Sequence, residues 1–159
     1  MAIKLSKKKV AAYNKSQTTP KTPSKVIPFI DRMRVSINFE PGEMAEEVQS
    51  NIWAQVADKD AFTQVASKGS YNAAWRIKIA SALKLKHYPL MQYRHADKCA
   101  VRLAIDFAPH DLGPEGLDYM HIALKSIVDG GWVAFVELGK VNMIEVTVDL
   151  HGVPMGGFH

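Results

Sequence analysis

The chain has 159 residues, of which 47% are hydrophobic, so it suits one domain with a buried core and leaves little room for a second. No apolar run approaches the ~18 residues that a membrane span needs, and the lysine-rich start lacks the apolar segment of a secretory signal. The single Cys99 excludes an internal disulfide. We therefore expect a cytoplasmic protein with no membrane partner.

The positive charge is concentrated at the N-terminus. The net charge is +4, yet residues 1–25 hold seven lysines and no acid, which leaves 13 basic against 16 acidic residues in the remainder. Residues 1–28 also contain three prolines and many polar residues, a composition typical of a flexible arm. Such an arm can contact nucleic-acid phosphate, with Lys7, Lys8 and Lys9 as the candidates, or it can be a solubilising leader.

The folded part is expected to begin with a strand and a helix. Met33, Val35, Ile37 and Phe39 alternate with polar residues, which predicts a strand with one buried face. A helix follows Pro41-Gly42, because acidic residues occupy its first turns and apolar residues recur every four positions. The residues expected to face the core are Met44, Val48, Ile52 and Val56, with Trp53 beside them.

Further along, residues 58–72 are polar and contain Lys68-Gly69-Ser70, so at least part of this stretch is expected to be a loop. Strands are expected at 75–79, at 90–95 and at 102–107, the last ended by Pro109. A helical stripe over 117–128 stops at Gly130-Gly131, a short edge strand is expected at 133–136, and a final strand at 141–150. This order predicts an α+β fold over residues 29–159: a mainly antiparallel sheet with two helices packed on one face, preceded by the flexible basic arm.

The final strand carries polar side chains at alternate positions. Ile144, Val146, Val148 and Leu150 alternate with the polar row Glu145, Thr147, Asp149 and His151. If the strand at 102–107 were its neighbour, Asp106 would join Glu145 and Asp149 on one face. Three such carboxylates can hold a divalent cation; the other interpretation is the solvated side of a half-buried sheet.

A second group of residues suggests nucleic-acid contact. Basic residues follow one another through the middle strands with one acid, Asp97, among them: Arg76, Lys78, Lys84, Lys86, Arg94, Lys98 and Arg102. They are interleaved with Trp75, Tyr88 and Tyr93, a pattern that suits phosphate contacts and base stacking. Solvated strand faces with the aromatic residues in the core would give the same pattern.

The two acidic strands together resemble a known family. Residues 102–109, Arg-Leu-Ala-Ile-Asp-Phe-Ala-Pro, and residues 143–150, Met-Ile-Glu-Val-Thr-Val-Asp-Leu, are similar to two strand motifs of the rolling-circle replication initiators of plasmids and filamentous phages. In that family the motifs read Leu-Arg-Ile-Glu-Phe-Asn-Pro and Arg-Ile-Asp-Val-Ala-Val-Asp, with a helix between them. The resemblance covers about residues 31–159 in the order of elements.

The resemblance implies a DNA-nicking chemistry. Such initiators join a tyrosine covalently to a 5′ phosphate, and a divalent metal polarises the scissile phosphate. By position, Asp106, Glu145 and Asp149 would be the acidic ligands of Mg²⁺ or Mn²⁺. The chain departs from the pattern, since Glu145 replaces an Asp, Asp106 replaces a Glu, and no His-hydrophobic-His motif is present. The segment expected to hold the nicking tyrosine would follow His159.

These observations predict a DNA-binding protein of rolling-circle replication, initiator-like and without the nicking segment. Its partners would be single- or double-stranded DNA and host replication proteins. The predicted DNA contacts are Lys7, Lys8, Lys9, Arg76, Lys78, Arg94 and Arg102. A nicking enzyme would need one of the five tyrosines to lie within reach of the acids. The alternative is an α+β protein-interaction module whose lysine-rich arm serves only solubility.

Overall fold

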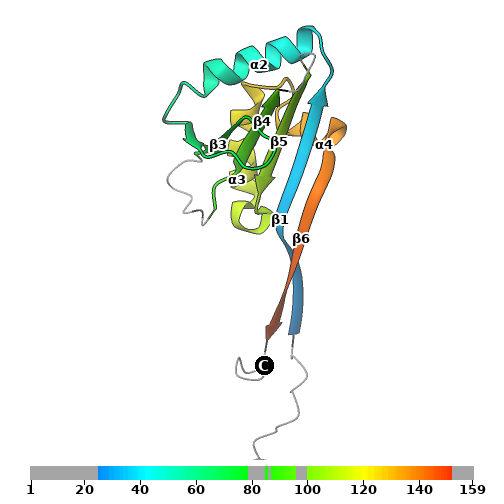
Figure 1. Ribbon diagram of the computed structural model, residues 1–159. Helices are drawn as coiled ribbons and strands as arrows, with labels where there is room; N and C mark the ends of the chain where they lie inside the picture. Colours follow the sequence, from blue (N-terminus) through cyan, green and yellow to red (C-terminus); the bar gives the residue numbers. More distant parts are fainter. Residues whose placement is uncertain (1–24, 79–84, 86, 96–99, 152–159) are drawn as a thin grey trace, which may run out of the picture. The chain divides into compact units, whose positions relative to one another are not determined.

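A computed structural model describes residues 25–78, 85, 87–95 and 100–151 (Figure 1). It confirms the α+β class. The elements in chain order are β1 (Lys25–Phe39), α2 (Glu43–Gln55), β2 (Phe62–Val65), β3 (Ala73–Ile77), β4 (Leu90–His95), β5 (Val101–Phe107), α3 (Pro109–Lys125), α4 (Trp132–Leu138) and β6 (Lys140–His151). The chain divides into a larger unit, Phe29–Thr147, and a smaller one whose described residues are the strand ends 25–28 and 148–151.

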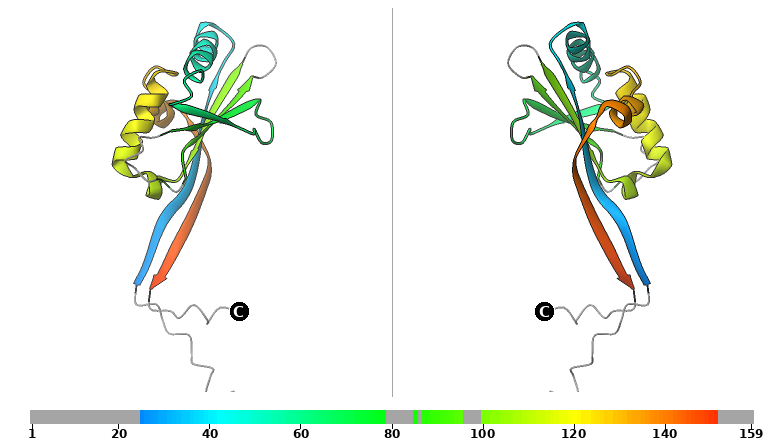
Figure 2. Two further views of the ribbon diagram at one scale, coloured as in Figure 1. Left: turned by 90° about the vertical axis from the view of Figure 1, so that its left-hand side faces the viewer. Right: turned by 90° about the vertical axis from the view of Figure 1, so that its right-hand side faces the viewer.

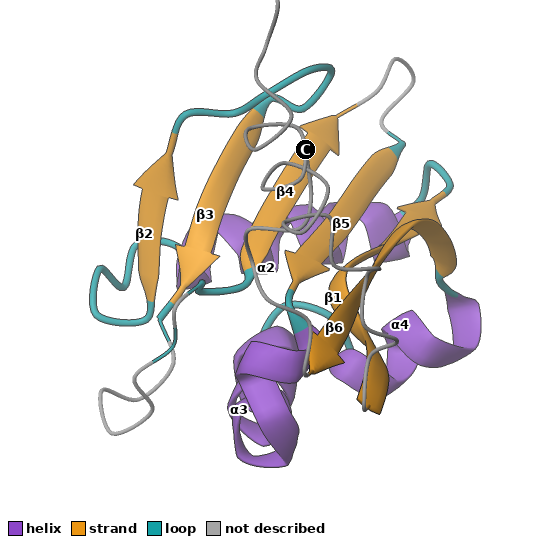
Figure 3. Ribbon diagram, turned by 90° about the horizontal axis from the view of Figure 1, so that it is seen from below, coloured by secondary structure: helices purple, strands orange, loops and turns teal. Residues whose placement is uncertain are grey.

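The strands form one antiparallel sheet in the order β2-β3-β4-β5-β1-β6 (Figure 3). The strands pair in register across the centre of the sheet. There each residue lies opposite the next in the series Val35 of β1, Ile105 of β5, Met91 of β4 and Trp75 of β3. Strand β1 therefore lies between the two strands that carry the acidic motifs. The condition for three converging carboxylates, that 102–107 and the final strand are neighbours, is therefore not met.

The core lies between one face of the sheet and the helices (Figure 2). Alternate side chains of each strand point to the same face, so Val101, Leu103, Ile105 and Phe107 of β5 enter the core together. Rings on the helices meet rings on this face. Trp53 of α2 packs edge-on against Trp75 and Tyr93, and Trp132 of α4 packs edge-on against Phe107. All of these contacts lie on one side of the sheet.

Helix α2 forms where the acidic first turn predicted it. Glu43 and Glu46 lie in that turn, near the positive end of the helix dipole, and Val48 and Ile52 are buried. Met44, which was expected to face the core, is 63% exposed, because the buried stripe instead begins at Ala45.

Several boundaries differ from the expectation. Strand β1 begins at Lys25, so the last four residues assigned to the arm are in a strand, whereas residues 1–24 lie outside the described part. The stretch 58–72, expected to be at least partly loop, also contains strand β2, which pairs with β3. The segment 133–136 is helical, which makes three helices rather than two. A short apolar run does not distinguish a strand from a buried helix, and here Ala134 and Phe135 enter the core.

Strand β6 does not bury its apolar row. It is an edge strand, and the exposed fractions are 51% for Ile144 and 63% for Val146. The expected half-buried strand, with apolar residues inside and polar residues outside, is therefore wrong for this segment. No helix among the described residues covers the row.

Tyr93 provides a test of the core. Its hydroxyl is buried without a hydrogen-bond partner among the described residues, and burial raises the pKa of the phenol. Because an unsatisfied buried hydroxyl costs about 1–3 kcal/mol, we predict that Tyr93→Phe raises the free energy of unfolding by about 1 kcal/mol. Urea titration should show a higher midpoint with an unchanged slope. A lower midpoint would show that the hydroxyl has a partner.

Candidate nucleic-acid interface

The side of the sheet opposite the helices carries polar side chains in regular rows. We call it the helix-free face and define it by the alternate residues of four strands. The row Arg76, Leu90, Asp106 and Arg34 crosses β3, β4, β5 and β1. The next row is Ala74, Gln92, Ala104 and Ser36, and the last is Arg94, Arg102 and Asn38.

Every arginine in the chain belongs to this face. The sequence holds five arginines, and four of them occupy the rows just described. The fifth, Arg32, precedes Arg34 by two residues on β1 and reaches the same carboxylate. The only acid in the rows is Asp106, so these arginines and Asp106 carry a formal charge of +4. The fifteen lysines lie elsewhere in the sequence.

Asp106 holds two of these arginines in place. Its side chain is 3% exposed, and both of its oxygens accept hydrogen bonds. Arg32 donates from Nε to Oδ1 (2.5 Å) and from Nη2 to Oδ2 (2.9 Å), and Arg34 donates to Oδ2 from Nη2 (2.6 Å) and Nε (3.1 Å). The hydrogen bonds to Asp106 raise the pKa of Arg32 above its ordinary value. Both side chains remain partly exposed, 46% for Arg32 and 30% for Arg34, so they are held in place yet accessible.

Arg102 occupies the opposite side of the face. Its Nη2 donates to Ser36 Oγ and to Asn142 Oδ1, both at 3.3 Å, and Asn142 Nδ2 donates to Ser36 Oγ at 2.6 Å. This small network connects β5, β1 and β6. The Nε of Arg102 and the Oε1 of Gln92 are buried and have no partner among the described residues. The middle of the face therefore retains an unused donor and an unused acceptor.

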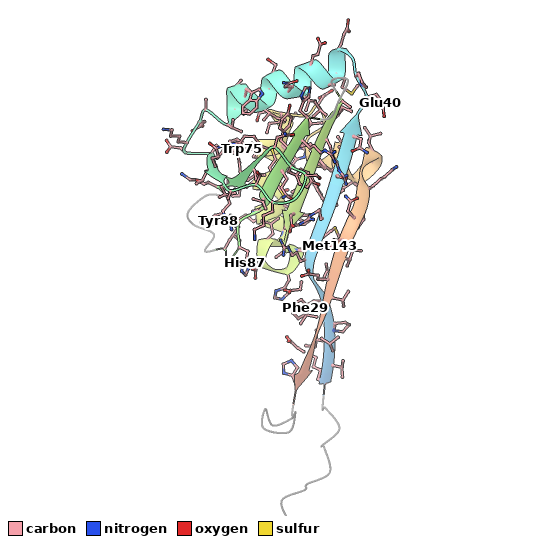
Figure 4. The ribbon with its side chains drawn as sticks, in the orientation of Figure 1. Phe29, Glu40, Trp75, His87, Tyr88 and Met143 are labelled. Atoms are coloured by element: carbon pink, nitrogen blue, oxygen red, sulfur yellow. The ribbon has the colours of Figure 1, made fainter. Side chains whose placement is uncertain are left out.

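A cavity of about 300 Å³ adjoins the first row. Its lining includes Arg32, Arg76, His87, Tyr88, Asp106 and Glu145. His87 and Tyr88 lie just before β4 (Figure 4), and the Nδ1 of His87 is 3.2 Å from Asp111 Oδ2. Of the tyrosines, Tyr88 thus shares a cavity with two of the three predicted acidic ligands.

The structure brings together only part of the predicted metal site. Asp106 and Glu145 line the same cavity, whereas Asp149 belongs to the smaller unit. Both oxygens of Asp106 are engaged by guanidiniums, an arrangement that does not fit a cation ligand. Within the described ranges, no group of three or more His, Cys, Asp or Glu side chains is placed to hold a metal. The Mg²⁺ or Mn²⁺ assignment stays a prediction.

The predicted DNA-binding residues fall into three groups. Arg76, Arg94 and Arg102 lie together on the helix-free face. Lys78 lies apart from them: its Nζ donates to the carbonyl oxygen of Lys59 at 2.5 Å, beside Trp53 and Trp75. The remaining candidates lie outside the described residues: Lys7, Lys8, Lys9, Lys84, Lys86 and Lys98. Trp75 and Tyr93 are in the core, so they do not stack bases as the interleaved pattern suggested.

Sequence reasoning missed Arg32 and Arg34 as site residues. Both alternate with Met33 and Val35, so a row of arginine at every second position was visible in the first strand. What the sequence did not reveal was the carboxylate that binds these two arginines. Only the pairing of β1 with β5 places Asp106 opposite Arg34.

The comparisons do not place the chain in a known group. No protein-family model, no curated protein and no solved structure matches it. In the part of the chain that the structure describes, no helix is long and apolar enough to cross a membrane.

Asp106 should contribute measurably to stability. We predict that Asp106→Asn lowers the free energy of unfolding by about 1–3 kcal/mol, because charge-assisted hydrogen bonds from two guanidiniums are lost or weakened. Arg32→Ala should cost less, since Arg34 still neutralises the carboxylate. Urea titration of the variants, with circular dichroism to check folding, measures both effects. Equal stability of Asp106→Asn and the unaltered protein would contradict the prediction.

Proposed function

We propose that this chain is a DNA-binding protein of phage or plasmid rolling-circle replication, and that its helix-free face contacts the phosphate backbone. The observation that carries the proposal is the placement of all five arginines on one face of the sheet, with Asp106 as the one acid in its rows and Glu145 in the adjoining cavity. A folded body with an excess of acidic residues has no general reason to collect its arginines in this way. Binding of a polyanionic partner would be such a reason.

Arginine suits this task better than lysine. Its guanidinium is planar and presents several donors in a fixed fork, which matches the oxygens of a phosphate. Asp106 restrains Arg32 and Arg34 in advance, so less side-chain freedom is lost when they bind. Phosphate contacts of this kind fix a protein on DNA without reading its sequence.

The rows of the face hold no aromatic side chain. In this proposal the affinity for DNA therefore comes mainly from the charges and not from base stacking. The alternative function is a protein-interaction module, in which the same arginines would meet an acidic protein surface. Affinity for DNA that falls steeply with salt favours the first function.

A nicking enzyme is the second candidate, and one observation favours it. Tyr88 lines the cavity that also contains Asp106, Glu145 and two arginines. In such a reaction the Tyr88 oxygen would bond to phosphorus, and the 3′ oxygen of the broken strand would leave with a proton. His87, paired with Asp111, lies in the same lining and is the candidate to move that proton.

The arginines should determine both the affinity for DNA and its dependence on salt. We predict that the variant with Arg76, Arg94 and Arg102 all changed to alanine binds labelled duplex and single-stranded DNA more weakly. Its log–log salt slope should fall by about 2–3, since each lost phosphate contact removes about 0.7–0.9. Fluorescence anisotropy at several salt concentrations measures this.

Matched variants distinguish the loss of a charge on the helix-free face from the loss of the same charge elsewhere on the protein. Arg102→Ala and Lys125→Ala remove the same charge, but Lys125 lies in the last turn of α3, away from the face, so only the first should weaken binding. A variant with Lys7, Lys8 and Lys9 changed to glutamine measures the share of the arm. Equal effects of Arg102→Ala and Lys125→Ala would refute the proposed face.

Nicking has its own readout. If the second candidate is correct, incubation with labelled single-stranded DNA and Mg²⁺ or Mn²⁺ will leave a protein-linked strand on a denaturing gel. Tyr88→Phe should abolish that band while leaving the anisotropy of binding unchanged, because only the attacking oxygen is removed. An adduct that persists in Tyr88→Phe, or no adduct at all, argues against nicking at this cavity and leaves the binding proposal intact.

A further inference from the structure

Exposed apolar side chains are concentrated at one edge of the sheet. Seven of the thirteen large hydrophobic side chains that are exposed among the described residues belong to the short segment 133–148, which comprises most of α4 and β6. In order they are Val133, Val136, Leu138, Val141, Ile144, Val146 and Val148. Isolated exposed apolar residues are ordinary, but a continuous run on one edge marks an interaction surface.

Strand β6 also lacks two features that keep edge strands from pairing, proline and an internal lysine. It has twelve residues, it contains neither proline nor glycine, and it is the last strand on its side of the sheet. Edge strands are usually short, or interrupted by proline, bulges or lysine. The one lysine of β6 is at its first position, Lys140, so no proline or lysine interrupts residues 141–149.

We propose that β6 pairs antiparallel with β6 of a second copy of this chain, in a register centred on Val146. A two-fold interface places the same patch on both subunits, so the residues opposite each other must add to a constant number. With Val146 opposite itself, Ile144 lies opposite Val148. The exposed apolar row of one copy then meets the apolar row of the other along its whole length.

The charges select this register over its neighbours. Centring the pair on Glu145 would place that carboxylate opposite itself, and centring it on Thr147 would place Glu145 opposite Asp149. Like charges directly opposite each other are destabilising. Centring on Ile144 would oppose Val146 to Asn142. In the Val146 register, Glu145 faces Thr147, so no like charges meet.

The two-fold axis of such a pair stands perpendicular to the sheet. The two helix-free faces would therefore lie on the same side of a sheet that continues from one copy to the next. The inference does not depend on DNA binding, because it rests on β6 alone. If both hold, each dimer presents the arginines twice on one surface.

Cysteine cross-linking tests the register in the full chain. In a Cys99→Ser background, Val146→Cys should form a disulfide-linked dimer on mild oxidation, because opposite residues of an antiparallel pair have Cα atoms about 4.5–5.5 Å apart, within disulfide reach. Ile144→Cys alone should not, but a mixture of Ile144→Cys and Val148→Cys should. Ile122→Cys, at a position on α3 that is 65% exposed, controls for random collision. Cross-linking of Ile122→Cys to the same extent overturns the proposal.

Sedimentation velocity tests the dimer without cysteine. The unaltered chain should be dimeric at micromolar concentration. Val146→Lys places two ammonium groups opposite each other and should raise the dimer dissociation constant at least about tenfold, whereas Ile122→Lys should not. Circular dichroism confirms that both variants fold. A monomeric unaltered chain, or a dimer that is indifferent to Val146→Lys, overturns the proposal, and a partner protein on β6 would then be sought.

Discussion

The ion pairs between Asp106 and two arginines of β1 are the constraint on which the site depends. A carboxylate that is 3% exposed needs partners, because burying a charge alone is costly. Here the partners are Arg32 and Arg34 on the adjacent strand β1. The same ion pairs therefore link β1 to β5 and hold the two arginine side chains in place. Both arginine side chains nevertheless remain partly exposed to solvent. The ion pairs that stabilise the fold are thus the same ones that position the arginines for the proposed phosphate contact.

The sheet separates two kinds of chemistry on its two faces. Rings and aliphatic side chains fill the face that the helices cover, as in the contacts of Trp53 with Trp75 and Tyr93. The other face collects the arginines around a central row with small residues such as Ala74 and Ala104. The interleaving of aromatic and basic residues along the chain is therefore a consequence of strand alternation. It does not indicate that rings and cations share a surface.

Local features of the fold were predictable from the sequence, and pairings between distant strands were not. The alternation at 33–39, 90–95 and 102–107 and the acidic first turn of α2 identified those elements, because each depends on neighbouring residues. That β1 separates β5 from β6 depends on contacts about 70 to 110 residues apart, which no local pattern specifies. Whether the strands of Asp106 and Glu145 are neighbours therefore stayed a condition of the predicted metal site. Arg32 and Arg34 were missed for the same reason, since their role appears only once Asp106 is opposite them.

Strand β6 shows how far alternation alone can mislead. Its apolar row has the period of a half-buried strand, yet Ile144 and Val146 are exposed, because burial requires a second layer that the described residues do not provide. A row of this kind is costly to leave in water, and it is also the row that a matching strand would cover. Glu145 lies between Ile144 and Val146 and limits the registers in which two such strands can pair. Registers that place acidic residues opposite each other are excluded, whereas the register that places Glu145 opposite Thr147 is allowed. The pattern that suggested a core strand is thus the same pattern that specifies a self-complementary edge.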